Sequence, residues 1–204
     1  MRPRRRGAIV LLLPLIGGAA AAADVDLEWI ERAPLEAGEI LVDSDRDPGS
    51  SRVRVKVAAL MDAPPKAIFD VLTACEIAPE YVPNVVSCRR LETLDGGKAE
   101  LFVQVVKPAF FLPRFEHVFR LDYERYETIG VHRVSGPIAY LEGMWWLLPE
   151  PSGATLVVYD LEVDPGMPVP RFWVRATMKR DLPRIVEAVR VRAERAAAEE
   201  PAAP

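Results

Sequence analysis

The chain has 204 residues, of which 50% are hydrophobic and 27% are charged, and its formal net charge is −4. The hydrophobic content excludes general disorder, and the length suits a single domain with a sizeable core. The acidic balance argues against nucleic acid as a partner, because nucleic-acid binding depends on basic surface.

The N-terminal residues 1–23 have the pattern of a secretory signal peptide. Four arginines precede the short apolar stretch Ala8–Ile16, and small residues follow up to Ala23. The alternative is an uncleaved membrane anchor, but this needs about 20 mostly apolar residues, and Pro14 interrupts the run. We therefore expect cleavage before Asp24 and export to a bacterial periplasm. Losing the four arginines leaves 22 basic and 30 acidic residues, so the mature charge is near −8.

Residues 24–49 have an irregular pattern and are expected to form an N-terminal extension, with one short strand at Glu39–Val42. The first clear strand follows, because Val53, Val55 and Val57 alternate strictly with basic residues. Such alternation predicts a half-buried antiparallel strand.

Two short helices are expected next, within "MDAPPKAIFDVLTACEIAPEYVPNV". The prolines suit a first helical turn, and Asp62 is a candidate cap. Ile68, Val71 and Leu72 recur at helical spacing, and a second short helix is expected at Glu76–Val82.

Six further strands are separated by short, turn-like links such as "LDGGK" and "EPSGA". Short links favour antiparallel neighbours, because a parallel crossover needs a dozen residues or more. The expected strands are Val85–Glu92, Lys98–Lys107, Phe115–Glu124, Thr128–Ser135, Ile138–Pro149 and Thr155–Asp164.

The last element is a long amphipathic helix from Pro170 to about Ala198, followed by a disordered tail at 199–204. Its apolar stripe consists of Val174, Met178, Leu182, Ile185 and Val189. Pro183 is expected to kink the helix, or to restart it with Asp181 as a cap. A single antiparallel sheet must cover its apolar face, and this helix is the only element large enough. A sheet curled around one helix tends to leave an apolar tunnel.

This order of elements resembles the START-like (SRPBCC), helix-grip superfamily, which includes Bet v 1-type proteins, polyketide cyclases and coenzyme Q-binding proteins. The resemblance rests on "APPKAIFDVLTACEIAPEYVPNV", "SCRRLE", "LEGMWWLLPEPSGATLVVYDLEV" and "VPRFWVRATMKRDLPRIVEAVRVRAE". It implies an α+β helix-grip fold over residues 50–198, with a curved antiparallel sheet of about seven strands wrapped on the C-terminal helix. It also implies a cavity for a hydrophobic small molecule, but not one reaction, since fold does not fix function.

The stretch "KPAFFLPRF" places Phe110, Phe111 and Leu112 between two prolines at the tip of a connection. In the family, loops around the closing helix often gate the cavity. We expect this tip to fold over the cavity mouth or to dip into a membrane surface. The alternative is ordinary packing on the body of the protein.

On the strand that follows, Phe115, His117 and Phe119 share the apolar face. His117 is interpreted as a core histidine bonded to backbone, or as a polar contact to the head group of a ligand. A catalytic base is disfavoured, because the sequence places no nucleophile or orienting acid beside it.

Two adjacent tryptophans follow in "YLEGMWWLLP". The family's G-x-W pattern favours Trp145 as the inward one, as cavity wall or as pure packing. Trp146 would then lie on the outer face, under another element or in a dimer contact. Gly143 indicates a bulge or a close approach.

On the closing helix, Phe172, Met178 and Leu182 are candidate cavity wall. A basic stretch lies near its start and would be a solvated face or a contact for anionic lipid head groups. The basic residues are Arg171, Arg175, Lys179 and Arg180.

Cys75 and Cys88 are the only cysteines. They are expected to form a disulfide if the protein is exported, or to be two small buried residues. The sequence has no phosphate-cradling glycine loop, no G-x-S-x-G, no H-E-x-x-H and no paired cysteine motif for a metal. No metal and no cofactor are therefore expected.

These features predict binding or transfer of a lipid-, quinone- or polyketide-like molecule in an internal cavity. One alternative is an enzyme of the cyclase or aromatase kind that uses His117, Arg133 or Tyr159 as inward polar groups. Another is a protein-interaction module whose cavity is filled by side chains. The expected partners are a hydrophobic small molecule and, transiently, a membrane surface, and the oligomeric state is left open.

Overall fold

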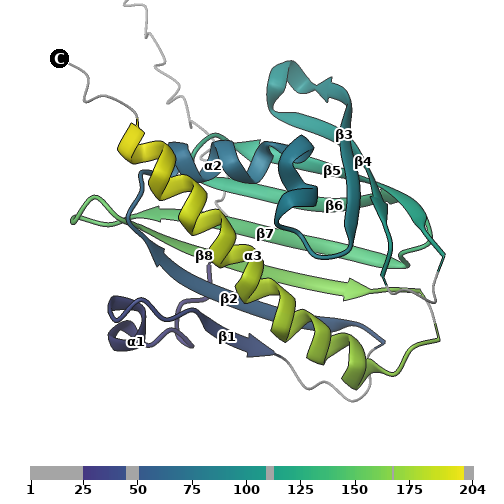
Figure 1. The fold of residues 1–204 in the computed structure, drawn as a ribbon, viewed down its shortest axis with the longest axis horizontal. Helices are drawn as coiled ribbons and strands as arrows, with labels where there is room; N and C mark the ends of the chain where they lie inside the picture. Colours follow the sequence, from purple (N-terminus) through teal and green to yellow (C-terminus); the bar gives the residue numbers. More distant parts are fainter. Residues whose placement is uncertain (1–24, 45–50, 109–112, 167, 200–204) are drawn as a thin grey trace, which may run out of the picture.

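The structure, a computed structural model, describes residues 25–44, 51–108, 113–166 and 168–199. These residues form a curved antiparallel sheet of eight strands, and the long helix α3 (Arg171–Glu199) crosses one face of it (Figure 1). The strands are β1 (Leu41–Ser44), β2 (Val53–Met61), β3 (Val85–Leu94), β4 (Ala99–Val106), β5 (Phe115–Glu124), β6 (Thr128–Ser135), β7 (Tyr140–Pro149) and β8 (Thr155–Asp164). This is the α+β helix-grip architecture that the sequence predicts.

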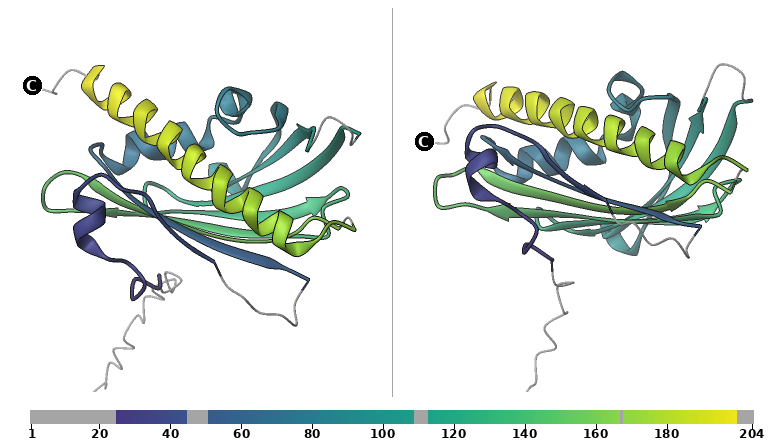
Figure 2. Two further views of the ribbon diagram at one scale, coloured as in Figure 1. Left: turned by 60° about the horizontal axis from the view of Figure 1, so that its bottom comes forward. Right: turned by 90° about the horizontal axis from the view of Figure 1, so that it is seen from below.

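The strands lie in the order β1-β2-β8-β7-β6-β5-β4-β3, and all neighbours are antiparallel. The pairing of β2 with β8 brings the two ends of the domain together. The register shifts twice between β3 and β4, and bulges of this kind bend a strand. This edge of the sheet curls up toward the side on which α3 lies (Figure 2).

Alternation of side chains accounts for most of the sheet. Val53, Val55 and Val57 are buried while Arg54 is exposed, and β5, β6 and β8 have the bounds that the sequence predicts. The eighth strand is β1, where the sequence indicated one short strand. The sequence did not predict helix α1 (Arg32–Glu36), because five residues are too few to show a helical period.

The helix pair after β2 is α2 (Pro65–Thr73) and a 3₁₀ helix, η1 (Cys75–Glu80). The expected cap at Asp62 is wrong. Pro64 occupies the N-cap position without a side-chain bond, and Asp62 precedes it by two residues. Asp62 instead uses its backbone amide, which donates to Oε1 of Glu194 on α3 at 2.9 Å.

Helix α3 runs through Pro183 as one element, so the expected restart with Asp181 as a cap is also wrong. Proline removes one backbone hydrogen bond. Packing on both sides of Pro183 offsets this loss, because Leu182 and Val186 are buried against the sheet. The predicted stripe does face inward, with Val174, Leu182 and Val189 buried and the other two residues half-buried.

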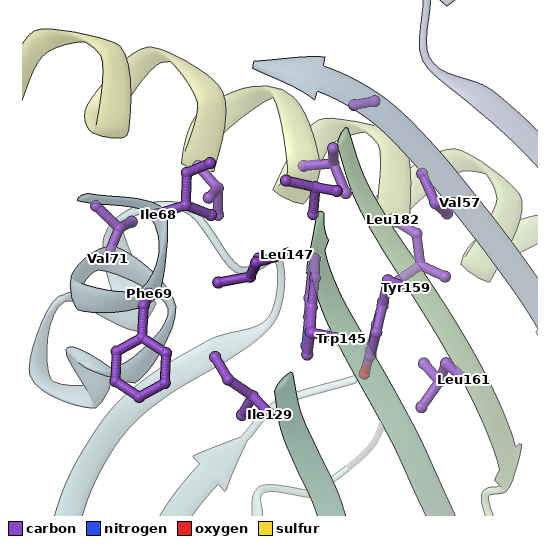
Figure 3. Close-up of a cluster of buried hydrophobic side chains, with 14 of the residues drawn as sticks. Val57, Ile68, Phe69, Val71, Ile129, Trp145, Leu147, Tyr159, Leu161 and Leu182 are labelled. Carbon is purple, nitrogen blue, oxygen red and sulfur yellow. The ribbon is translucent and has the colours of Figure 1, made fainter. Parts of the chain in front are cut away.

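Both faces of the sheet carry an apolar cluster. The larger cluster fills the concave side under α2 and α3, where Ile68, Leu147 and Trp145 lie between helix and sheet (Figure 3). The smaller cluster lies on the opposite face, where Leu35 packs with Trp146 and with apolar residues of β2 and β8. The described N-terminal residues therefore cover the outer face of the central strands.

Candidate functional site

A cavity of about 370 Å³ lies between the concave face of the sheet and the first half of α3. Its walls come from the end of α2, from η1, from β3 to β8 and from α3, and most of the lining side chains are apolar. The lining includes Leu72, Val85, Val106, Phe115, Phe119, Leu121, Val131, Leu141, Trp145, Leu161, Met178, Leu182 and Ile185. The volume falls within the range of about 300–1,000 Å³ that is typical of small-molecule sites.

The concave side is solid at one end and hollow at the other. Under α2 and the second half of α3, Ile68, Val186 and Val189 are fully buried. The lining residues of α3 all lie in its first half, from Thr177 to Ile185. One helix cannot fill a curved sheet along its whole length, and α2 supplements it at one end only.

Trp145 and Tyr159 form part of the cavity wall on the central strands. Their rings are stacked, with centroids 3.8 Å apart and planes 9° from parallel. Gly143 permits this arrangement, because a Cβ at that position would lie 3.0 Å from the hydroxyl of Tyr159. The glycine thus marks a close approach, and Trp146 points to the outer cluster, as the sequence favoured.

His117 on β5 is a buried polar group in the cavity wall, with 5% of its surface exposed. Its Nε2 lies 3.0 Å from Oε1 of Gln104 on the neighbouring strand, so the imidazole donates to a side chain rather than to backbone. Loss of solvation on burial lowers the pKa of His117 to about 4. At neutral pH the imidazole is therefore uncharged.

Asp181 on α3 is the one charged side chain among the described lining residues. Its two carboxylate oxygens accept hydrogen bonds from Arg180, at 2.7 Å from Nε and 3.0 Å from Nη2. Arg180 itself is exposed, so the pair places a carboxylate at the wall and its counter-charge in solvent.

A disulfide joins Cys75 at the start of η1 to Cys88 on β3, with the Cα atoms 5.4 Å apart. Both cysteines line the cavity. The bond thus ties the edge strand of the sheet to the 3₁₀ helix that closes this side of the cavity.

Most of the predicted site residues come together at this cavity, but two do not. Those that line it are Phe115, His117, Phe119, Trp145, Tyr159, Met178 and Leu182. Arg133 is absent from the wall, because its Nη2 donates to the carbonyl of Gly136 at 2.8 Å and its Nε donates to that of Ile138. Phe172 is also absent and is 72% exposed. It lies about half a turn from Val174, where the inward stripe begins. Phe110 and Phe111 lie outside the described residues.

Sequence reasoning missed two polar lining residues that carried a signal. Gln104 shares the inward face of β4 with Phe102 and Val106. Asp181 follows Met178 by three residues and so falls within the apolar stripe of α3. A polar residue at a core position of a regular pattern is the signal in both cases.

In the ranges that the structure describes, no three His, Cys, Asp or Glu side chains gather to hold a metal ion. The same ranges include no helix that is both long and apolar enough to cross a membrane.

The curved sheet, its C-terminal helix and the apolar cavity between them define a START-like helix-grip protein. Residues 61–190 match the family described as "Polyketide cyclase / dehydrase and lipid transport", and the chain belongs to this family. No curated protein matches the sequence.

Several solved structures share the fold at low sequence identity. A STAR-related lipid transfer protein from Xanthomonas axonopodis is 18% identical, with a TM-score of 0.66 over 76% of this chain and 93% of that one. The ZhuI aromatase/cyclase from Streptomyces sp. R1128 is 17% identical, with a TM-score of 0.62 over 74% and 99%. Human STARD10 is 14% identical, with a TM-score of 0.60 over 79% and 70%.

Proposed function

We propose that this protein binds one hydrophobic small molecule, of a lipid-, quinone- or polyketide-like kind, in the cavity and passes it on. The observation that carries this proposal is the cavity of about 370 Å³ with its mainly apolar wall. Burial of apolar surface contributes about 25 cal/mol per Å², so an isoprenoid or acyl chain gains useful affinity without specific hydrogen bonds. The STAR-related neighbour, described as a lipid transfer protein, supports the same function.

A cyclase-type enzyme is the second candidate, because His117 and Tyr159 line the same cavity and one neighbour is an aromatase/cyclase. A general base works best when its pKa lies near the working pH, whereas burial lowers the pKa of His117 to about 4. This favours binding over proton abstraction by His117. The wild-type protein would have to turn over a polyketide substrate to reverse this preference for binding. The His117→Gln variant would then have to lose that turnover while keeping its affinity for the substrate.

Native mass spectrometry of the protein, purified from the compartment in which it accumulates, tests the binding proposal. We expect one hydrophobic molecule per chain, released by organic extraction and absent from the denatured spectrum. A protein that carries no molecule and takes up no hydrophobic probe would instead favour a protein-interaction module.

We further propose that the first half of α3 docks on an anionic lipid surface. Phe172 and Trp173 are 72% and 40% exposed at its start. Residues 171–184 include five basic residues and one acidic residue, in a chain that is acidic overall. Exposed aromatic side chains beside basic ones suit the interface of a membrane that contains anionic lipids. The cavity-lining part of α3 lies in the same half of the helix, so docking there would bring the cavity close to the lipid.

Vesicle flotation tests this docking surface. We expect binding to vesicles that contain phosphatidylglycerol, weaker binding to pure phosphatidylcholine, and loss of binding as salt is raised. Phe172→Ser with Trp173→Ser should abolish flotation, whereas Val134→Ser, at a residue 46% exposed on β6, should not. Equal flotation of both variants would contradict the proposal.

We also propose that the chain is exported and acts in the periplasm. The disulfide between Cys75 and Cys88 supports this, because such bonds persist in oxidising compartments. Cell fractionation, with the mass of the recovered protein, tests export and cleavage after residue 23 together.

The prediction for Phe110 and Phe111 as a gate or membrane contact is tested by substituting both with serine and measuring ligand uptake and flotation.

A further inference from the structure

We infer that the part of the ligand inside the cavity is uncharged, with a hydroxyl or carbonyl as its polar group, and that the cavity rejects anions. This inference rests on the proposed binding function and names the class of ligand that the same cavity takes.

The charge of the cavity wall disfavours an anionic ligand. Among the described residues that line the cavity, none is a lysine or an arginine, and Asp181 is the one acidic side chain. A carboxylate, sulfonate or phosphate inside would lose its hydration without meeting a cation, and it would face a like charge. Burial of an unpaired charge costs several kcal/mol, which exceeds the gain from a few buried methylene groups.

Three cations near the cavity, Arg180, Arg133 and Arg192, are engaged elsewhere. Arg180 binds the carboxylate of Asp181 through two hydrogen bonds. Arg133 donates to two backbone carbonyls, and Arg192 stacks over the ring of Tyr81 at 4.9 Å. Recruiting any of these three to an anionic head group would break a contact that the protein already has.

The polar groups that do line the cavity are neutral. His117 and Gln104 form a pair across β4 and β5, and the imidazole is uncharged at neutral pH because burial lowers its pKa. An amide and an imidazole can exchange single hydrogen bonds with a hydroxyl or a carbonyl group. They cannot neutralise a full negative charge. The wall is therefore suited to one weakly polar head on an apolar body.

Two fluorescent probes with the same aromatic framework test this inference. N-phenyl-1-naphthylamine is neutral, and 1-anilinonaphthalene-8-sulfonate adds one sulfonate. We expect the neutral probe to saturate at one per chain and to bind at least about tenfold more tightly than the anion, a difference of about 1.4 kcal/mol. At neutral pH, we also expect 1-dodecanol, but not dodecanoate, to displace the bound neutral probe.

A substitution pair separates charge from shape. Gln104→Arg introduces a permanent cation into the wall and should reduce or reverse the preference, whereas Gln104→Met removes the amide without adding charge and should keep it. Equal or tighter binding of the sulfonate probe by the wild-type protein would overturn the inference. It would do so even if Arg175→Gln abolished binding of the sulfonate probe, because a cation would then serve the site. If neither probe binds, the proposed binding function itself fails.

Discussion

The rings of Trp145 and Tyr159 are stacked at 3.8 Å between centroids, on the neighbouring strands β7 and β8. Both residues are buried, and both line the cavity. The stack makes this part of the wall a flat aromatic surface on two interior strands, each of which pairs with a neighbouring strand on both sides.

Replacing Tyr159 with alanine is expected to lower the free energy of unfolding by about 3–5 kcal/mol, as for other large aromatic residues in cores. The lost ring also enlarges the cavity, so larger probes should bind relatively better. Urea denaturation and a series of probes of increasing size measure both effects. Tyr159→Phe is the matched control and should change stability by less than about 1.5 kcal/mol. An alanine variant with unchanged stability would show that the stack contributes little.

Gly143→Ala tests the close approach of β7 to Tyr159. The new Cβ would lie 3.0 Å from the hydroxyl and 3.1 Å from Cε2 of that ring. We expect a loss of about 1–3 kcal/mol, because a packed core resists added volume. The hydroxyl is one of the two clashing groups, so Gly143→Ala should cost less when combined with Tyr159→Phe. Strictly additive losses in this double-mutant cycle would argue against the contact.

Reduction of the disulfide between Cys75 and Cys88 should loosen the wall formed by η1 and β3. The bond closes a loop with a sequence separation of 13, for which chain entropy predicts about 3 kcal/mol of stabilisation. Denaturation with and without dithiothreitol, together with probe affinity, measures the effect. Without reductant, the double variant Cys75→Ala/Cys88→Ala should have the same lowered stability and probe affinity as the reduced wild type. Dithiothreitol should not change either property of this variant. Unchanged probe affinity after reduction would mean that the bond does not shape the cavity.

The buried imidazole of His117 predicts a dependence of stability on pH. Its pKa is about 4 in the folded protein and near 6.5 in the unfolded chain, so unfolding takes up a proton between these values. The stabilisation is complete above pH 6.5 and is lost as the pH falls toward 4, by up to about 3 kcal/mol. The difference between wild type and His117→Gln, measured from pH 7 to 4, isolates this contribution from that of the carboxylates. Parallel curves for the two proteins would contradict the lowered pKa.

Regular patterns allowed the sheet and the closing helix to be predicted from the sequence. One buried face explains both patterns, namely the alternation of Val53, Val55 and Val57 on a strand and the helical spacing from Val174 to Val189. Helix α1 gave no such signal. Its formation depends on Leu35 packing beside Trp146, a contact that the sequence alone does not reveal.

The position of a site residue could be predicted where the face of a strand decides it, since Phe115, His117 and Phe119 all line the cavity. Their role in ligand binding stays a prediction. The position of Arg133 was not predicted, because it donates to nearby backbone carbonyls and does not line the cavity. Pro183 predicts a helix start with Asp181 as its cap, whereas tertiary packing keeps α3 continuous. Long-range packing therefore overrides the local rule at Asp181, whereas at Arg133 nearby backbone carbonyls bind the guanidinium before it can reach the cavity.

The central claim is that the hollow between α3 and the sheet holds a guest molecule. Titration with N-phenyl-1-naphthylamine tests it most directly in the wild type, in Met178→Trp, which fills the cavity wall, and in Ala176→Trp, at an exposed position two residues away. We predict one saturable site in the wild type and in Ala176→Trp, and an affinity lowered at least about tenfold in Met178→Trp. Equal binding by all three proteins, or by none, would contradict the account.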